Sequence, residues 1–221
     1  MRAVLSLLLL LLVACGPRLA PDPGRVLAIG DSVVAWNGRD GIPEVAAARL
    51  GLPVADAAQS LAHVDHPSGT AAALGFDIRR QWAANRGRWA WVILDGGGND
   101  LRDLCATPRE AAARDALIAD DLTGAIPALI ADIRATGSRA AFVGYYDGAE
   151  ASPTGFTPCQ GAFTVMNGRL ARLAARDPGL VFLDAGDVID PARPELYDRD
   201  RVHPSVEGSR LIGEALAARM R

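Results

Sequence analysis

The sequence predicts an α/β protein in which helices cover both faces of a sheet of about five parallel strands. Short, almost wholly apolar runs recur along the 221-residue chain, and segments with the apolar spacing of helices separate them. Continuous apolar runs of this length are typical of parallel strands, which are buried on both faces. No internal repeat interrupts the alternation, so we expect a single domain with one core.

Five segments have the character of buried strands. In chain order they are residues 26–29, 53–58, 89–94, 139–143 and 180–183. The first runs directly into Gly30, and the third is followed closely by three glycines. Glycine ends a strand and lets the chain turn sharply, so short turns are expected at this edge of the sheet.

Segments with helical spacing lie between these strands. They are residues 42–50, residues 107–134 with a break or a bend around Gly124 and Pro127, residues 165–176, and a last helix capped by Ser205. A serine can cap a helix, because its hydroxyl accepts a hydrogen bond from a free backbone N–H in the first turn. Residues 148–161 are rich in Pro, Gly and Thr, and we expect a loop there.

The N-terminus has the features of an export signal. Arg2 precedes an apolar run over residues 3–14, and Cys15 follows. Such a run reaches only about 18 Å as a helix, well short of the ~30 Å hydrocarbon core, which indicates a signal peptide rather than a membrane span. Residues 12–15, LVAC, resemble a bacterial lipoprotein box, which implies cleavage before Cys15 and its lipidation. An ordinary secretory signal with an incidental cysteine is the alternative.

We therefore expect a signal peptide over residues 1–14, an extended tether over residues 15–24 and one domain over residues 25–221. Lipid chains on Cys15 would hold the protein on a membrane of the bacterial cell envelope without crossing it, facing the periplasm or the exterior. The sequence leaves open which membrane this is, and it leaves the oligomeric state open.

The charged residues exclude several functions. The formal net charge is −3, and all 23 basic residues are Arg because the chain has no Lys. A Schiff-base lysine, a phosphate-loop lysine and a Ser–Lys dyad are therefore excluded. No basic stripe stands out, so nucleic acid is not an expected partner.

Two cysteines remain once Cys15 is assigned to the anchor. They are Cys105 and Cys159, and in an exported protein such a pair favours a disulfide. Two free thiols are the alternative, because a sequence does not give the distance between them.

Three short strings, in a fixed order, carry residues suited to acyl chemistry. They are Gly30-Asp31-Ser32, Gly97-Gly98-Asn99-Asp100 and Asp200-Arg201-Val202-His203-Pro204. The first two follow predicted strands, and the third lies between the last strand and the last helix. Ligands of such sheets bind beyond the carboxyl ends of the strands, so the three strings are expected to form one site.

Ser32, His203 and Asp200 have the residue types of a nucleophile, its base and a group that orients the base. A serine hydroxyl becomes a good nucleophile when an imidazole takes its proton, and a nearby carboxylate fixes the ring. Each string alone also has a structural explanation. Asp31 or Ser32 could cap a helix, and the Asp-x-x-His pair could be a solvated surface turn. Asp198 is a competing orienter with a less suitable spacing.

Asn99 is the candidate oxyanion donor. A fixed amide beside the reacting carbonyl stabilises its developing negative charge by ~3–4 kcal/mol. The preceding glycines let the backbone approach a substrate closely. An asparagine that only satisfies a turn is the alternative, and Asp100 is expected to be a structural partner in the same loop.

Together these strings resemble those of the SGNH, or GDSL-type, hydrolases. The resemblance covers most of the chain after Gly24 and implies a three-layer, flavodoxin-like sandwich. It implies Ser32 as the nucleophile, His203 as the base, Asp200 as the orienter and Asn99 as an oxyanion donor. It also implies that the backbone N–H of Ser32 joins the oxyanion hole.

The chain departs from the family pattern at one oxyanion position. The family usually has a glycine after the second strand, and Leu61 holds that place here. A backbone N–H is kept in every residue except proline, so Leu61 is still expected as a donor. Its side chain could narrow the pocket or demand another backbone angle. Gly69 is the other candidate, although it comes late in the chain.

His63, Asp65 and His66 raise the possibility of a metal site. Zinc would need a further ligand of suitable spacing, and none is evident, so neither a metal nor a cofactor is expected. Trp36 is close to Ser32 in the sequence and is expected to line an acyl pocket.

We therefore expect a serine esterase that hydrolyses a small acyl ester, with a lipid, a thioester or an O-acetylated glycan as the substrate. An O-acyltransferase would use the same site, with a sugar hydroxyl in place of water. A catalytically weak envelope-binding lipoprotein is the third alternative. The intact set of Ser, His, Asp and Asn argues against it, whereas Leu61 leaves it open.

Overall fold

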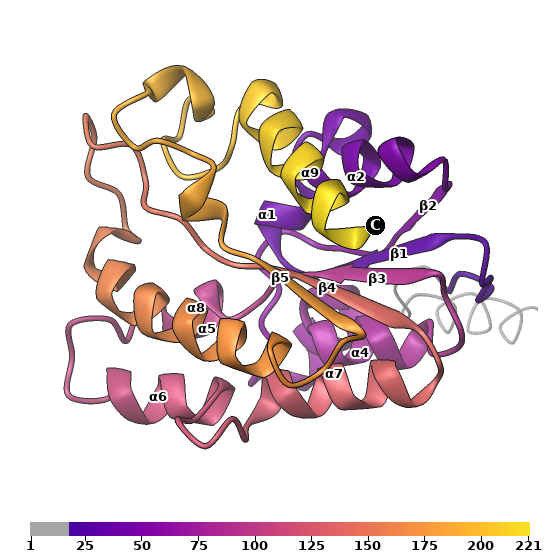
Figure 1. Ribbon diagram of the computed structural model, residues 1–221. Helices are drawn as coiled ribbons and strands as arrows, with labels where there is room; N and C mark the ends of the chain where they lie inside the picture. The colour runs from indigo at the N-terminus through magenta and orange to yellow at the C-terminus, as the bar shows by residue number, and fades with distance from the viewer. Residues whose placement is uncertain (1–17) are drawn as a thin grey trace, which may run out of the picture.

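A computed structural model describes residues 18–221, and these residues form the predicted sandwich (Figure 1). All strands pair in parallel, in the order β2-β1-β3-β4-β5. The strands are β1 Val26–Ile29, β2 Val54–Asp56, β3 Trp91–Leu94, β4 Arg139–Val143 and β5 Leu180–Leu183. Each lies within the segment predicted for it. The central strands β1, β3 and β4 are the most fully buried, as their continuous apolar runs predict.

Helices cover both faces of the sheet (Figure 1). Helices α2 and α9 pack together on one face with α1 beside them, and α4, α7 and α8 cover the other face. The helices are α1 Ser32–Ala35, α2 Ile42–Leu50, α3 Gly69–Ala71, α4 Ile78–Ala84, α5 Gly98–Leu101, α6 Glu110–Leu117, α7 Ala125–Ala135, α8 Gln160–Ala174 and α9 Val206–Met220. Ser205 caps α9 as predicted, since its side chain accepts from the N–H of Gly208.

The helical pattern predicted over residues 107–134 is broken rather than bent, because α6 and α7 are separate helices. Helix α6 ends at Leu117, since Ile118 has an extended backbone. Gly124 has a φ of +130°, and a Cβ on it would lie 2.6 Å from the carbonyl oxygen of Leu117. This glycine therefore permits a close return of the chain rather than a bend within a helix.

Two further differences concern helices that lie beside loops. Helix α8 begins at Gln160 rather than residue 165, so the loop before it is shorter than the predicted 148–161. Because that segment contains proline and glycine, its composition predicts a loop and does not reveal where the helix begins. Helices α3 and α4 occupy residues 69–84 together with a π-helical turn at Ala72–Phe76, and the sequence did not predict them.

The described part of the expected tether lies against the domain. Leu19 packs on the core, and its N–H donates to Asn85 Oδ1 at 2.6 Å. The chain therefore joins the domain at Leu19, before the predicted boundary at residue 25. The predicted signal peptide over residues 1–14 and Cys15 lie outside the described residues. Within residues 18–221, no helix is long and apolar enough to cross a membrane.

Cys105 and Cys159 form the disulfide that the sequence favoured, with their Cα atoms 5.0 Å apart. The bond joins the segment after α5 to the start of α8, 54 residues later in the chain. It therefore ties together two segments that reach the same edge of the sheet.

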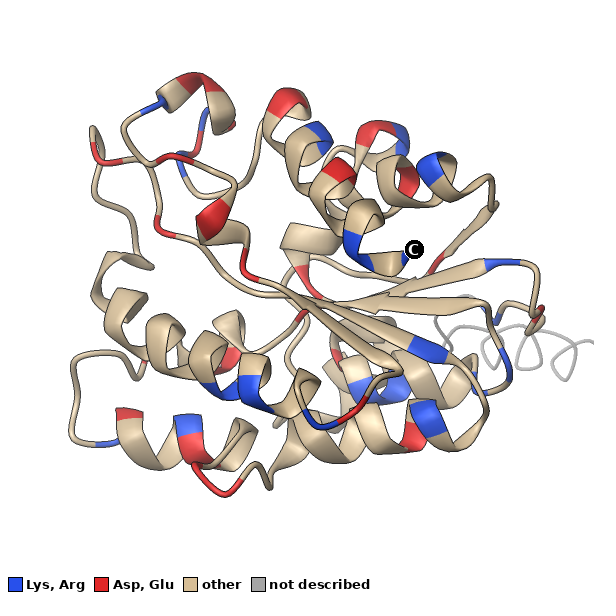
Figure 2. Ribbon diagram, in the orientation of Figure 1, with Lys and Arg blue, Asp and Glu red and all other residues tan. Residues whose placement is uncertain are grey.

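Charged side chains of both signs occur on both helical layers (Figure 2). On α9, Arg210 pairs with Glu207 at 2.7 Å and with Glu214 at 2.8 Å. Exposed pairs of this kind stabilise a fold only weakly, because water and salt screen the attraction. Their main effect here is local neutralisation, in keeping with the small net charge.

Candidate active site

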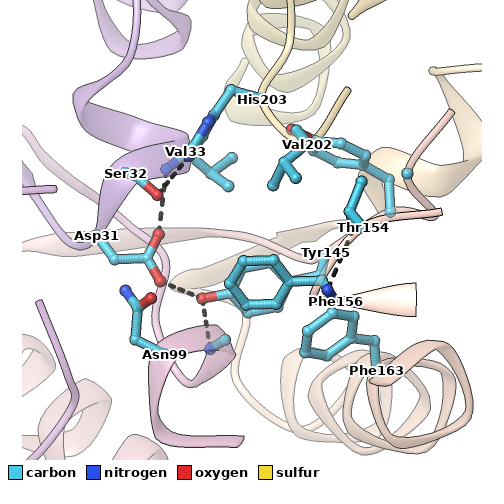
Figure 3. Close-up of a pocket in the computed structure, with 13 residues that line it drawn as sticks. Asp31, Ser32, Val33, Asn99, Tyr145, Thr154, Phe156, Phe163, Val202 and His203 are labelled. Carbon is cyan, nitrogen blue, oxygen red and sulfur yellow. Dashed lines mark hydrogen bonds between the residues drawn. The ribbon is translucent and has the colours of Figure 1, made fainter. Parts of the chain in front are cut away.

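Ser32 lies at the carboxyl end of β1, where the chain turns sharply into α1. The turn requires Gly30, which has a φ of +143°, because a Cβ there would lie 1.9 Å from Asp95 Oδ1. Asp31 caps α1 by accepting from the N–H of Val33 at 3.1 Å. The capping role considered for this string therefore belongs to Asp31, and the hydroxyl of Ser32 is left to face the pocket (Figure 3).

His203 connects Ser32 to Asp200. Its Nε2 lies 2.7 Å from Ser32 Oγ, and its Nδ1 lies 2.5 Å from Asp200 Oδ2. Asp200 Oδ1 also accepts from the backbone N–H groups of Val202 and His203, at 3.0 Å each. Partial burial works to raise the pKa of Asp200, but these hydrogen bonds outweigh it and hold the pKa below its usual value. The structure thus places an ionised carboxylate against the ring nitrogen that faces away from Ser32.

Trp36 does not line the pocket beside Ser32, so that expectation is wrong. Its ring stacks on the imidazole of His203, with centroids 3.9 Å apart and planes 11° apart. Its Nε1 donates to Asp198 Oδ2 at 2.9 Å. Asp198, the competing orienter, therefore holds the tryptophan rather than the histidine. Trp36 thus supports one face of the imidazole.

Asn99 follows β3 and lines the same pocket as Ser32 and His203. Its Nδ2 donates one hydrogen bond to the carbonyl oxygen of Ala62 at 2.9 Å, which fixes the amide. An NH₂ group has a second hydrogen to donate. Asp100 accepts from the N–H of Val64 at 3.0 Å, so it has the structural place in the loop that was expected.

Leu61 has a φ of +69°, the left-handed conformation that glycine adopts most easily. Its side chain is 58% exposed. Leu61 is not one of the residues that line the pocket, but Ala62, the next residue, accepts the hydrogen bond from Asn99. Gly69 lies exposed at the start of α3 and does not have a positive φ. Of the two candidates, Leu61 and not Gly69 has the left-handed backbone conformation that would explain a glycine at this position in the family.

A buried polar network lies beneath the nucleophile, and its members Asp95 and Tyr145 were not predicted. Asp95 Oδ1 accepts from the N–H of Asp31 at 2.6 Å, and its Oδ2 accepts from the N–H of Val34 at 3.1 Å. Tyr145 donates its hydroxyl hydrogen to Asp31 Oδ2 at 2.5 Å and accepts from the N–H of Gly98 at 2.8 Å. Burial raises the pKa of Asp95 well above its usual value, and the charge of Asp31 raises it further.

This network fixes the turn that carries Ser32, because it satisfies the N–H groups on both sides of the serine. The only sequence signal for it was a charged residue, Asp95, at the end of an apolar run. Nothing in the local sequence marks Tyr145, which approaches from the end of β4.

The pocket beside Ser32 is small and mainly apolar (Figure 3). Its free volume is about 30 Å³. Besides the polar residues already described, its walls are Val33, Tyr145, Tyr146, Thr154, Phe156, Phe163 and Val202, together with Gly98 and Gly148. The rings of Tyr145 and Phe163 stack, with centroids 4.7 Å apart.

The side chains considered as metal ligands, those of His63, Asp65 and His66, do not converge on a common centre. His63 and His66 contact each other edge to face, with centroids 4.6 Å apart, whereas Asp65 pairs with Arg79 at 3.2 Å. Among residues 18–221, no three His, Cys, Asp or Glu side chains are grouped so that they could hold a metal ion.

A hydroxyl, an imidazole and a carboxylate in hydrogen-bond contact at the carboxyl edge of a parallel sheet are the geometry of a serine hydrolase. The sequence model of the GDSL-like lipase/acylhydrolase family matches residues 28–211, and the chain belongs to this family of ester-hydrolysing enzymes.

Solved structures of SGNH hydrolases have the same fold. A Slackia heliotrinireducens protein regarded as an SGNH hydrolase is 22% identical, covers 90% of this chain and 100% of its own, and has a TM-score of 0.60. Phospholipase A1 of Streptomyces albidoflavus NA297 is 17% identical, with 90% and 100% covered and a TM-score of 0.62. A carbohydrate acetylesterase family member of Sinorhizobium meliloti is 17% identical, with 88% and 95% covered and a TM-score of 0.58. No curated protein sequence is significantly similar to this chain.

Proposed function

We propose that this protein is a serine esterase in which Ser32 attacks an acyl ester. The observation that carries the proposal is the unbroken line of hydrogen bonds from Asp200 through His203 to Ser32. Both imidazole nitrogens have partners with the right chemistry, a carboxylate on one side and a hydroxyl on the other.

In the first half of the reaction, Ser32 Oγ forms a bond to the ester carbonyl carbon while His203 Nε2 takes the hydroxyl proton. His203 then gives that proton to the leaving alcohol oxygen as the C–O ester bond breaks, which leaves an acyl group on Ser32. In the second half, His203 takes a proton from water as the water oxygen forms a bond to the acyl carbon. His203 then returns that proton to Ser32 Oγ as the bond between Ser32 Oγ and the acyl carbon breaks, which releases the acid and restores the free serine. Asp200 holds the ring and stabilises its positive charge in both halves.

The negative oxygen of each tetrahedral intermediate needs donors that are already in place. We assign this role to the second N–H of Asn99 Nδ2 and to the backbone N–H groups of Ser32 and Leu61. Neither of these two backbone groups donates a hydrogen bond to another described residue. The left-handed backbone of Leu61 supports its assignment, since it reproduces the conformation that a glycine would have there.

We further propose that lipidation of Cys15 anchors the enzyme to the cell envelope, where an ester of a lipid or an envelope glycan is the substrate. The structural relatives include both a phospholipase and a carbohydrate acetylesterase, so the fold is compatible with either class. In a bacterial host, Cys15→Ala is expected to move the protein from the membrane fraction to the soluble fraction.

The mechanism is tested by the hydrolysis of p-nitrophenyl acetate by the full-length protein in detergent. Ser32→Ala is expected to lower kcat by about 10⁶-fold with the free energy of unfolding little changed. Ser68→Ala, which alters an exposed serine outside the site, is the matched control and should keep its activity. Equal activity of Ser32→Ala and the unaltered protein would rule out the mechanism.

A further inference from the structure

We infer that the pocket beside Ser32 binds the acyl chain of the substrate and admits only short chains, from acetyl to butyryl. The inference rests on the proposed function, because it requires that Ser32 be the nucleophile. It narrows the substrate to short-chain esters and excludes the long acyl chains of membrane lipids.

The position of the pocket indicates which part of the ester enters it. Ser32, Asn99 and His203 all line it, so it opens directly at the carbon that Ser32 would attack. If Asn99 holds the carbonyl oxygen, either the acyl chain or the leaving alcohol has to occupy the rest of the pocket. The alcohol oxygen has to reach His203 Nε2 to receive its proton, which directs the alcohol away from the aromatic end of the pocket.

The lining of the pocket suits a hydrocarbon. In Figure 3, Phe156 and Phe163 lie at the end of the pocket away from Ser32 and His203, and the ring of Tyr145 lies between these rings and Asp31. Val33 and Val202 add two further apolar side chains to the lining. The carboxylate of Asp31, also in the lining, is engaged by the hydroxyl of Tyr145 and the N–H of Val33. A sugar or a charged headgroup would find few free hydrogen-bond partners there, and its burial would therefore be unfavourable.

The size of the pocket limits the length of the chain. A water molecule needs ~10–15 Å³ of such free volume, so about 30 Å³ accommodates two or three heavy atoms. An acetyl group places one carbon beyond the carbonyl, and a butyryl group places three. An octanoyl chain would need several times the free volume.

The walls are held in ways that oppose widening. Tyr145 makes two hydrogen bonds and stacks on Phe163. The hydroxyl of Tyr146 donates to the carbonyl oxygen of Val202 at 2.9 Å. The Cys105–Cys159 disulfide ties down the segment that follows Phe156. Phe156 itself is half-buried, and the Arg102 guanidinium lies 5.4 Å from its ring centroid.

The test compares kcat/KM for p-nitrophenyl acetate, butyrate and octanoate, which share one leaving group, with the full-length protein in detergent. We expect the acetate and the butyrate to be hydrolysed. The kcat/KM for the octanoate should be at least about tenfold lower than that for the butyrate. Phe156→Ala should raise the octanoate-to-acetate ratio about tenfold or more, and Phe156→Leu should raise it less. Val165→Ala, which truncates a side chain of α8 that is 40% exposed and outside the pocket, should leave the ratio unchanged.

The outcomes separate this inference from the proposed function. If no ester of any length is hydrolysed, the proposed function fails and the inference fails with it. If octanoate is hydrolysed as well as butyrate, or if both Phe156 variants fold and keep the original ratio, the chain-length inference alone is overturned. Phe156→Leu keeps an apolar side chain and serves as the decisive variant should Phe156→Ala fail to fold.

Discussion

The loops that follow the two edge strands of the sheet both serve the site, but they are built differently. After β5, side chains fix His203. Asp200 holds one ring nitrogen and Trp36 covers one face, while the N–H of Asp198 donates to the carbonyl oxygen of His203 at 2.8 Å. After β2, the geometry around Leu61 is set by the backbone.

The backbone contacts of the β2 loop are few but specific. Gln59 donates its N–H to the carbonyl oxygen of Gly30 at 3.1 Å, and Ala62 accepts from Asn99. In the proposed mechanism, proton transfer would therefore depend on which side chains the β5 loop carries, whereas the oxyanion site would depend on the path of the backbone in the β2 loop. Substitutions of side chains should therefore lower activity much more in the β5 loop than in the β2 loop.

Asp200→Asn is the substitution expected to have the largest effect on the side-chain-defined loop. A neutral amide does not stabilise the charged ring, and its NH₂ group can donate to Nδ1 and hold the imidazole in the wrong tautomer, so kcat should fall by about 10⁴-fold. The measurement is kcat for p-nitrophenyl acetate. Asp198→Asn is the matched control, because Asp198 contacts Trp36 and not the imidazole. A greater loss in Asp198→Asn would mean that the orienting carboxylate has been misassigned.

Asn99→Ala removes a side chain that connects the segment after β3 to the β2 loop. Removal of a preorganised oxyanion donor should lower kcat by about 10²–10³-fold. The loss of the bond to Ala62 should also lower the free energy of unfolding by about 1 kcal/mol. Steady-state kinetics and urea unfolding of the same preparation measure both. A variant that loses stability but keeps its kcat would contradict the oxyanion role.

Trp36→Leu removes the aromatic face from His203. Stacking on a ring that becomes charged during the reaction contributes about 1–2 kcal/mol, so kcat should fall between about 5- and 30-fold. Trp36→Phe keeps an aromatic face but loses the hydrogen bond to Asp198, and it should retain most of the activity. If the two variants lose equally, the hydrogen bond rather than the stacking supports the histidine.

Of these substitutions, Leu61→Gly should have the smallest effect on kcat. It should raise the free energy of unfolding, whereas Asn99→Ala should lower it. The backbone N–H remains, so kcat should change by less than about threefold. Relief of the left-handed strain exceeds the entropy that glycine loses on folding, so the free energy of unfolding should rise by up to about 1 kcal/mol. Leu61→Ala keeps the strain and is the control. A large loss of activity in the glycine variant would show that the leucine side chain itself is needed.

The sheet and the positions of the site residues were predictable because both follow from short local patterns. Buried apolar runs gave all five strands, and the strings around Ser32, Asn99 and His203 each follow a strand or a turn that the sequence marks. In a parallel sheet such residues have to meet at one edge.

The contacts that hold the site were not predictable in the same way. Trp36 and His203 are far apart in the chain, and the stacking between them depends on how α1 and the β5 loop pack. Tyr145 reaches Asp31 from a different strand, and no local pattern encodes that meeting. Helices α3 and α4 were missed because their start has three alanines and a glycine in place of a clear amphipathic stripe.

The carboxyl group of Asp95 makes a proton part of the folded structure. An aspartate in the unfolded chain releases its proton near pH 4, whereas burial raises the pKa of Asp95 in the fold well above that value. Between those two pKa values the folded state holds one more proton than the unfolded chain at this position. Its contribution to the free energy of unfolding therefore falls as the pH rises.

A rise in pH should thus lower the free energy of unfolding of the domain through Asp95. Urea unfolding at pH 5 and pH 8 measures this, and Asp95→Asn, whose amide does not ionise, should show a smaller decrease between the two. An equal decrease in the free energy of unfolding of both proteins would mean that a group other than Asp95 binds the proton. A smaller decrease in Asp95→Asn would mean that the contacts holding the turn at Ser32 weaken as the pH rises.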